Sequence, residues 1–354
     1  MISEIEIKNR ITKLRNYLEK FSLDGFLITN KVNMKYLTGF DGDGLLLVTM
    51  DDIVIISDER YQIELEQQSI NYIIGNDYLK QLMQLVSQKN LIALGFEESI
   101  EYENFDYLDE NSMADIVPVS NLIETLRAIK SESEIRKIKS ANQLVSDVLE
   151  RISASFSEYT ERDLAIEIDY LAKKAGATGA SFSPIIASGP NSALPHSTVT
   201  SRKLQNHDIL IADLGYFVEG YTCDITRTFS IGRTSTEIQQ LYSIVREARD
   251  EVLSNIHAGL PISKLMQTVN HIFKKYHVEQ YFTHGIGHGI GLSVHELPSL
   301  SSSETECLEE NQVITIEPGL YLQGIGGIRI EDDILVTKKG FENLTPMSAD
   351  LIEL

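Results

Sequence analysis

The chain has 354 residues, of which 42% are hydrophobic and 23% charged, and this composition predicts a globular protein large enough for two domains. Its formal net charge of −21 argues against nucleic acid as a partner, since the densest basic stretch, residues 127–139, is interleaved with glutamates. The N-terminus has no uninterrupted apolar run, and two cysteines cannot form a disulfide framework. We therefore expect no signal peptide, no membrane span and a cytoplasmic protein.

Helical and strand patterns alternate from residue 1 to about residue 125. Apolar residues at helical spacing predict a first helix over residues 5–18. Short apolar runs predict strands at residues 25–29, 45–49, 53–57, 72–74, 91–94 and 116–119. Further helices are expected near residues 58–67, 78–88 and 101–110. This alternation predicts an N-terminal α/β domain with a mixed sheet, over residues 1–127.

The rest of the chain, residues 128–354, predicts a second domain in which helices and strands are grouped rather than alternating. Capping-box patterns at Ser131 and Thr160 start two long helices, the second of which ends near Gly176. Two more helices are expected over residues 235–257 and 261–277. Strands are expected at residues 185–187, 209–214, 218–229, 290–296, 313–316 and 327–336. The pattern is that of an α+β domain.

Four carboxylates stand at or in these predicted strands. Asp213 ends an apolar run and Asp224 lies in the next one, so a hairpin between the two would bring their side chains to one face. Glu317 and Glu331 interrupt apolar sequence near the C-terminus, where a buried carboxylate is costly unless it is paired or binds a metal. An ion pair between Glu331 and Arg329 is the competing explanation.

A histidine- and glycine-rich segment, His284-Gly-Ile-Gly-His288-Gly-Ile-Gly, precedes the two glutamates. In extended chain His284 and His288 point to the same side, and no strand–turn–helix unit supports dinucleotide binding. A glycine-rich loop with structural histidines is the alternative. Four carboxylates and one imidazole suit a pair of divalent metals better than one zinc. Two such metals can activate water to attack a carbonyl, so the set predicts a metal-dependent hydrolase.

In its order and spacing, this set resembles the pita-bread-fold metallopeptidases, and in particular the Xaa-Pro peptidases, aminopeptidase P and prolidase. The resemblance spans essentially the whole chain and is carried by five stretches: SFSPIIASGPNSALPHS, DLGYFVEGYTCDITRTF, HGIGHGIGLSVHELP, VITIEPGLY and GGIRIEDDILVT. It implies an α/β N-terminal domain with a mixed sheet, followed by an α+β pita-bread catalytic domain of the creatinase/aminopeptidase type. It also implies a homodimer and a peptide substrate with proline in second position.

The resemblance assigns roles to individual residues. It implies two divalent metal ions, manganese in the first place and otherwise cobalt or zinc, and five ligands: Asp213, Asp224, His288, Glu317 and Glu331. Asp224 and Glu331 match the ligands that touch both metals, and Glu317 would also carry the proton of the attacking water. The implied substrate contacts are His196 near the scissile nitrogen, His295 at the carbonyl oxygen, and His284 and Tyr216 at the substrate. Arg329 and Thr226 would support the ligands from behind.

Two departures from the family pattern bear on activity. Cys223 stands where a serine is usual beside Asp224, and we expect altered tuning of the site rather than lost activity. Prolidases often carry an arginine that holds the carboxylate of a dipeptide, yet no Arg or Lys lies between His288 and Glu317. This favours an Xaa-Pro aminopeptidase over an Xaa-Pro dipeptidase. A methionine aminopeptidase and a non-catalytic pita-bread binding module are further alternatives.

Overall fold

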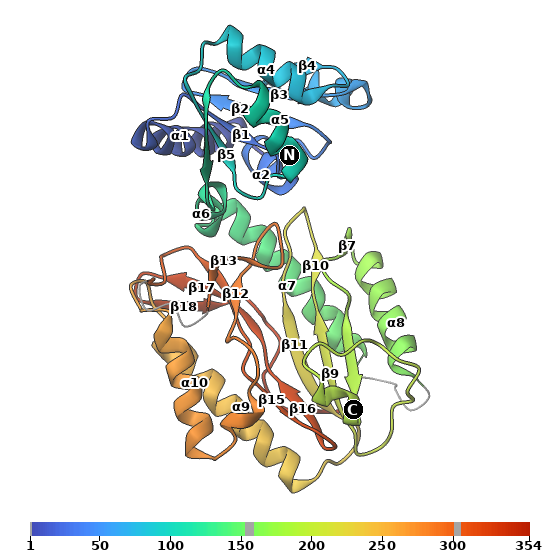
Figure 1. Cartoon of the computed structure of the whole chain (residues 1–354). Coiled ribbons are helices and arrows are strands. Elements are labelled where there is room, and N and C mark those ends of the chain that lie inside the picture. Colours follow the sequence, from blue (N-terminus) through green and yellow to red (C-terminus); the bar gives the residue numbers. More distant parts are fainter. Residues whose placement is uncertain (1, 153–158, 301–305) are drawn as a thin grey trace. The chain divides into compact units, whose positions relative to one another are not determined.

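The chain folds into two compact units, Met1–Arg127 and Ala128–Leu354, which we describe separately (Figure 1). The structure is a computed structural model that describes residues 2–152, 159–300 and 306–354. None of the helices in these described ranges is long and apolar enough to cross a membrane.

The first unit is built on one mixed sheet of strand order β4-β3-β2-β1-β5-β6. Its strands are β1 (Gly25–Ile28), β2 (Leu45–Thr49), β3 (Ile53–Ser57), β4 (Asn71–Ile74), β5 (Ala93–Glu97) and β6 (Asp115–Val119). Strand β1 lies in the middle, antiparallel to β2 and parallel to β5, and every residue in it is buried. This position explains why its sequence is a continuous apolar run.

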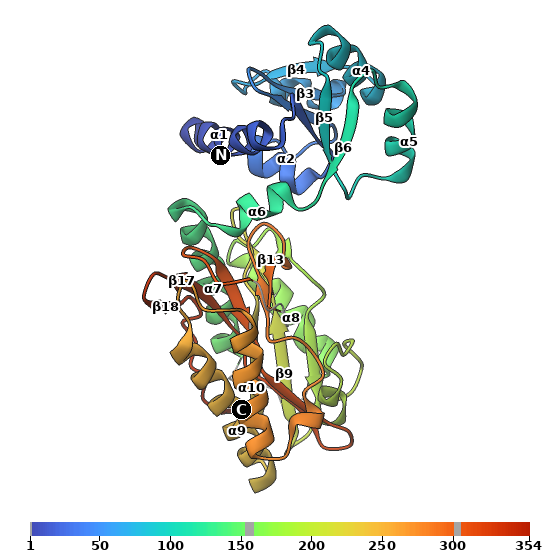
Figure 2. The same ribbon diagram turned by 60° about the vertical axis from the view of Figure 1, so that its left-hand side comes forward.

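Helices cover both faces of this sheet. The helices of this part of the chain are α1 (Glu4–Phe21), α2 (Lys31–Thr38), α3 (Gln62–Leu65), α4 (Tyr78–Gln88), α5 (Tyr102–Asn111) and α6 (Leu122–Ala128), which ends the unit, with a 3₁₀ turn at Glu59–Tyr61. Helix α1 begins at a capping box formed by Ser3 and Glu6 and packs against β2. On the other face lie α4 and α5 (Figure 2). Their Leu82 and Leu108 pack in one cluster with alternate strand residues such as Leu27 and Leu47.

The second unit has two pairs of long helices. The first pair is α7 (Glu132–Ile152) and α8 (Glu161–Lys174), and the second is α9 (Thr236–Asn255) and α10 (Ser263–Lys275); 3₁₀ turns lie at Gly189–Ala193 and Glu279–Tyr281. The partners of each pair contact one another (Figures 1 and 2). Ser131 and Thr160 stand before the first residues of α7 and α8, as their capping patterns predict.

The strands of the second unit form two main sheets and two short ribbons. The sheet orders are β19-β11-β9-β8 and β13-β12-β14-β17-β18, and the ribbons are β10-β7 and β15-β16. The first sheet and its ribbon comprise β7 (Gly179–Ala180), β8 (Ile185–Ser188), β9 (Ile209–Leu214), β10 (Tyr216–Phe217), β11 (Ile225–Ser230) and β19 (Ile352–Glu353). The other strands are β12 (His288–Gly289), β13 (Glu296–Ser299), β14 (Val313–Ile316), β15 (Gly319–Leu322), β16 (Gly326–Arg329), β17 (Asp332–Thr337) and β18 (Gly340–Asn343).

Two hydrophobic clusters hold these layers together. One joins α7 and α8 to β8, β9 and β11, and the other joins α9 and α10 to β14, β15, β16 and β17. The strands that carry the candidate ligands therefore have a helix pair behind them on each side. Such backing restrains the strands, and the ligands in them or next to their ends, more firmly than a surface loop could.

Three predicted strands differ from the observed ones. The first half of the strand predicted at residues 218–229 is a turn after β10, in which Glu219 and Gly220 have positive φ, and only its second half belongs to a strand, β11. The strand predicted at residues 327–336 divides between β16 and β17, and most of the strand predicted at 290–296 is loop. Asp224 and Glu331 lie at these interruptions, immediately before β11 and β17. Their backbone is therefore outside the regular pairing of the strands.

Candidate metal centre

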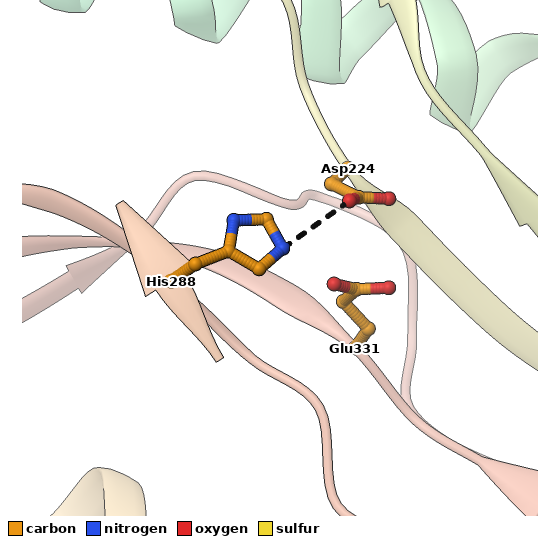
Figure 3. A group of neighbouring side chains, drawn as sticks. All are labelled: Asp224, His288 and Glu331. Carbon is orange, nitrogen blue, oxygen red and sulfur yellow. Dashed lines mark ion pairs between the residues drawn. The ribbon is translucent and has the colours of Figure 1, made fainter. Parts of the chain in front are cut away.

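Three of the predicted ligands converge in one group. Asp224 precedes β11, His288 begins β12 and Glu331 lies between β16 and β17, so the group draws on three separate parts of the second unit (Figure 3). One donor atom from each residue lies within 4.8 Å of the donor atoms of the other two. His288 Nε2 is 3.7 Å from Asp224 Oδ2. This spacing leaves room for an ion among the three groups.

The other two predicted ligands lie beside this group. Asp213 is in β9 opposite Thr226 of β11, in the antiparallel pairing that the sequence suggested. Glu317 follows β14, and its Oε1 is 3.8 Å from His288 Nε2. All five side chains line one cavity of about 890 Å³. The structure therefore brings the whole predicted set to one place.

The carboxylates in this cavity disfavour one another's charge. Burial raises the pKa of Asp224 and Glu331 well above the usual range, and the neighbouring carboxylates raise it further. Burial likewise raises the pKa of Glu317 to about 8. A cluster of this kind gains stability when a divalent cation replaces the protons, because the cation offsets several negative charges at once.

The donor atoms suit such a cation. Asp213 Oδ1 and Asp224 Oδ1 are buried, and neither has a hydrogen-bond partner in the described part of the chain. His288 Nδ1 lies 3.0 Å from the Gly289 carbonyl oxygen, which can only accept, so Nδ1 carries the proton and Nε2 offers its lone pair to the cluster. Burial lowers the pKa of His288 to about 4, so the ring is neutral at pH 7. Oxygen donors with one imidazole fit a hard to borderline divalent metal.

Arg329 supports the predicted ligands through two routes. Its guanidinium donates to Asp213 Oδ2 at 2.6 Å and to Thr226 Oγ1 at 3.1 Å, and Thr226 Oγ1 donates in turn to Glu331 Oε2 at 2.6 Å. The direct ion pair between Arg329 and Glu331 that the sequence left open is thus replaced by a pair with Asp213. Arg329 is linked to Glu331 through the Thr226 hydroxyl, so Arg329 and Thr226 contact the predicted ligands by hydrogen bonds.

His284 is held with a defined tautomer. Its Nδ1 donates to the Gly285 carbonyl oxygen at 2.7 Å, so its Nε2 accepts from the Tyr321 hydroxyl at 2.9 Å. Burial lowers the pKa of His284 to about 4, and the ring is neutral. Both ring nitrogens are hydrogen-bonded to other residues, so a ligand in the cavity would contact the ring of His284 rather than its nitrogen atoms. A neutral ring suits contact with an apolar group.

His196 and His295, the two predicted catalytic histidines, line the same cavity and are both exposed. The ring of His295 contacts that of His288 edge-on, with 4.3 Å between the ring centroids. Exposed imidazoles on a cavity wall can form hydrogen bonds with a bound ligand.

Two sequence-predicted features lie away from the cavity. Tyr216 is buried in the cluster beneath α8, and it is not among the described residues that line the cavity. The side chain of Cys223 packs into the same cluster, where burial raises the pKa of its thiol and keeps it protonated. Neither position supports a direct substrate contact.

Sequence reasoning also missed residues that shape the site. The Tyr321 hydroxyl accepts from Arg329 at 2.6 Å and links Arg329 to His284. Asp333 Oδ2 accepts from the backbone N–H of Asp224 at 3.2 Å and from Asn142 at 2.7 Å, which fixes the segment that carries the ligand. Arg162, from α8, lines the cavity. The Glu-Asp-Asp run after Arg329 was a signal for Asp333; the sequence offered no such signal for Arg162.

Two regions of the chain match known families. Residues 10–129 match the creatinase/prolidase N-terminal domain, and residues 136–338 match metallopeptidase family M24. Together with the solved structures described next, these matches confirm the predicted fold class, an α/β domain with a mixed sheet followed by a pita-bread domain.

Individual proteins are similar over almost the whole chain. The Xaa-Pro dipeptidase of Pyrococcus horikoshii is 32% identical over 357 residues, covering 98% of this chain and 99% of that protein. The structure of an Xaa-Pro dipeptidase from Bacillus anthracis matches with a TM-score of 0.95 and 33% identity, over 98% of this chain and all (100%) of that one. An X-Pro aminopeptidase from Thermotoga maritima matches with a TM-score of 0.89 and 31% identity, covering 96% and 100%. Relatives of both names are therefore similar to this chain.

Proposed function

The chain belongs to metallopeptidase family M24, and on this premise we propose that it is a metal-dependent Xaa-Pro aminopeptidase, hydrolysing the bond before proline at the N-terminus of peptides. The observation that carries the proposal is the convergence of Asp224, His288 and Glu331 in a cavity that also exposes His196 and His295. The creatinase/prolidase N-terminal domain supports Xaa-Pro peptidases over methionine aminopeptidases.

The proposal assigns the metals to the five clustered side chains. Asp213, Asp224, His288, Glu317 and Glu331 would hold two divalent ions, with manganese as the proposed metal. When bound, divalent metals supply Lewis acidity that polarises the scissile carbonyl and activates water. Arg329 and Thr226 keep two of the ligands oriented, by their hydrogen bonds to Asp213 and Glu331.

Other residues of the cavity would handle the substrate and its protons. The Glu317 carboxylate would take the proton of the attacking water and pass it on. His196 would lie at the scissile nitrogen and His295 would donate to the carbonyl oxygen. The neutral ring of His284 would form part of the wall that contacts the proline ring.

The preference for peptides longer than a dipeptide rests on the sequence between His288 and Glu317, which contains no Arg or Lys to hold the carboxylate of a dipeptide. The cavity volume, about 890 Å³, is in the range that encloses ligands larger than a dipeptide. The Xaa-Pro dipeptidase is the alternative, since similar proteins carry that name.

Peptide digestion with manganese tests the proposal. Ala-Pro, Ala-Pro-Ala and a longer Xaa-Pro peptide are compared with a Met-Ala-Ser control. Cleavage of the two longer peptides alone is the expected result, while cleavage confined to Ala-Pro would identify a dipeptidase. Release of methionine alone would indicate a methionine aminopeptidase. If no peptide is cleaved with any divalent metal, the result would favour the non-catalytic binding module.

Replacing His196 by alanine should reduce turnover without removing the metals. The side chain is exposed on the cavity wall, so the fold should persist, while loss of a proton donor or acceptor typically costs about 10²–10⁴-fold in kcat. Steady-state kinetics and metal content per chain would be measured together. A variant that kept full turnover, or that lost its metals, would contradict the role assigned to His196.

We also infer a cytoplasmic homodimer. The two cysteines, Cys223 and Cys307, are unpaired, which supports a reducing compartment, and the family resemblance supports a dimer. Light scattering of the purified chain would give its mass in solution, and a monomer would contradict the second part of this inference.

A further inference from the structure

Only two arginine or lysine side chains of the described residues line the cavity, Arg329 and Arg162. Arg329 is buried, and its guanidinium is already engaged by Asp213, Thr226, Tyr321 and the Pro195 carbonyl oxygen. Arg162 is exposed and makes no ion pair within 4 Å of any described carboxylate. Arg162 is therefore the cation that the cavity can offer to a ligand.

The backbone of Arg162 is fixed with respect to His196. Arg162 is the second residue of α8, and its N–H donates to the Thr200 carbonyl oxygen at 3.1 Å. The preceding residue, Glu161, is buried and accepts from Ser188, Asn191 and Thr200, so it ties the start of α8 to the segment that carries His196. His196 stands four residues before Thr200, so these bonds hold the start of α8 beside the segment that carries the residue proposed for the scissile nitrogen.

The surroundings of Arg162 favour binding an anion. Ala165 and Ile166, one turn along α8, line the same cavity, as do Phe182 and Pro184. A guanidinium beside apolar side chains binds a carboxylate more strongly than one surrounded by water does. Two nearby carboxylates have other hydrogen-bonded partners: Asp163, whose pKa the charge of Arg162 helps to lower, accepts from Thr160 at 2.9 Å, and Asp169 pairs with Lys173 at 2.8 Å.

We propose that Arg162 binds the C-terminal carboxylate of short Xaa-Pro peptides, of which the tripeptide is the substrate class that it selects. The inference rests on the proposed function, and it concerns a carboxylate one residue beyond the proline, not the dipeptide carboxylate for which the segment between His288 and Glu317 has no Arg or Lys. With His196 at the scissile nitrogen, as proposed, the residues that follow the scissile bond would extend toward Arg162 on the same cavity wall. The rest of the cavity is rich in carboxylates, which would repel a free substrate carboxylate. Arg162 would supply the positive charge that such a carboxylate needs.

The test compares Ala-Pro-Ala with its C-terminal amide, with manganese present. The wild-type chain should favour the acid in kcat/KM by about tenfold, as expected for a charged hydrogen bond. Arg162→Gln should lower the ratio of acid to amide to about one by slowing the acid alone, and Arg162→Lys should give an intermediate ratio. Arg233→Gln, at an exposed arginine outside the cavity lining, is the matched control and should keep the wild-type ratio.

Three results would overturn the inference: a wild-type chain that does not distinguish acid from amide, an Arg162→Gln variant that keeps the wild-type ratio, or a variant that loses both substrates equally. Failure of the proposed function has a different signature. In that case the wild-type chain would cleave neither the acid nor the amide. The amide is therefore an internal measure of Xaa-Pro hydrolysis that does not depend on Arg162.

Discussion

Replacing Glu331 by glutamine is expected to abolish peptide hydrolysis while leaving the fold intact. Glu331 is buried among Asp224, His288 and Glu317, and a neutral amide would not replace it in the proposed role of a ligand shared by two metals. Loss of several kcal/mol of electrostatic stabilisation, roughly 4 kcal/mol, corresponds to about a thousandfold fall in kcat/KM. Glutamine keeps the shape of the side chain and can still accept from the Thr226 hydroxyl.

Thermal unfolding separates this loss of function from a loss of stability. With a chelator, Glu331→Gln should unfold at or above the wild-type temperature, because one of several repelling carboxylates is gone. Manganese at a hundredfold excess over its Kd should raise the wild-type Tm by about 5–10 °C and leave that of the variant unchanged. Glu310→Gln, at an exposed position, is the matched control and should behave like the wild type. Full manganese-dependent activity in Glu331→Gln would refute the ligand assignment.

Elements with continuous apolar runs and clear ends were predicted to the residue. Strands β2, β3, β9 and β14 and helix α4 have the bounds that the sequence indicated. Helix α2 was not predicted, because it is only eight residues long and its start depends on the Asn30 side chain, which accepts from the N–H groups of Val32 and Asn33. Short elements give too few apolar repeats for a periodicity to emerge.

The interruptions of the strands at the candidate ligands could not be predicted from the sequence, because contacts between distant parts of the chain create them. The Glu331 N–H donates to the Thr226 carbonyl oxygen at 3.1 Å, and the Glu331 carbonyl oxygen accepts from Arg227 at 2.6 Å. These bonds to β11 replace the strand pairing that the apolar pattern of residues 327–336 predicts. The sequence could suggest that Glu331 is special, but the interruption of the strand depends on residues a hundred positions earlier.

The stretches that resemble the family contain three histidines of the cavity wall, His196, His284 and His295, but they do not account for the whole wall. Tyr216 was predicted from its place in the stretch that contains Asp213, yet its ring is buried under α8. Arg162 lies on a helix that carries no predicted ligand, but the bonds of Glu161 bring it to the cavity. Motif spacing locates ligands that come from a few strands, whereas the wall of a cavity collects residues from any element that packs beside them.

Replacing Asp332 by asparagine is expected to destabilise the second unit by about 3–5 kcal/mol, the usual cost of removing one partner from a buried ion pair. Asp332 is fully buried, with Arg227 at 2.7 Å and Arg249 at 2.5 Å. Arg227 also donates to the carbonyl oxygens of Glu331 and Met347, so its uncompensated charge would loosen the segment that carries a ligand. Urea unfolding followed by circular dichroism gives the free energy, and hydrogen exchange would assign the loss to β11 and β17.

The acid side of the stability profile offers an independent check on the same pair. Burial by itself raises the pKa of Asp332, but Arg227 and Arg249 outweigh this effect and lower the pKa below its usual value. An acid whose folded-state pKa is lowered stabilises the fold above its unfolded pKa, about 4, and loses that contribution as the pH falls through the folded value. Wild-type stability should therefore fall more steeply below pH 4 than that of Asp332→Asn.

Asp250→Asn removes an exposed partner of the same Arg249 and should cost under about 1 kcal/mol. Equal losses in the two variants would show that the buried charge does not hold the strands together.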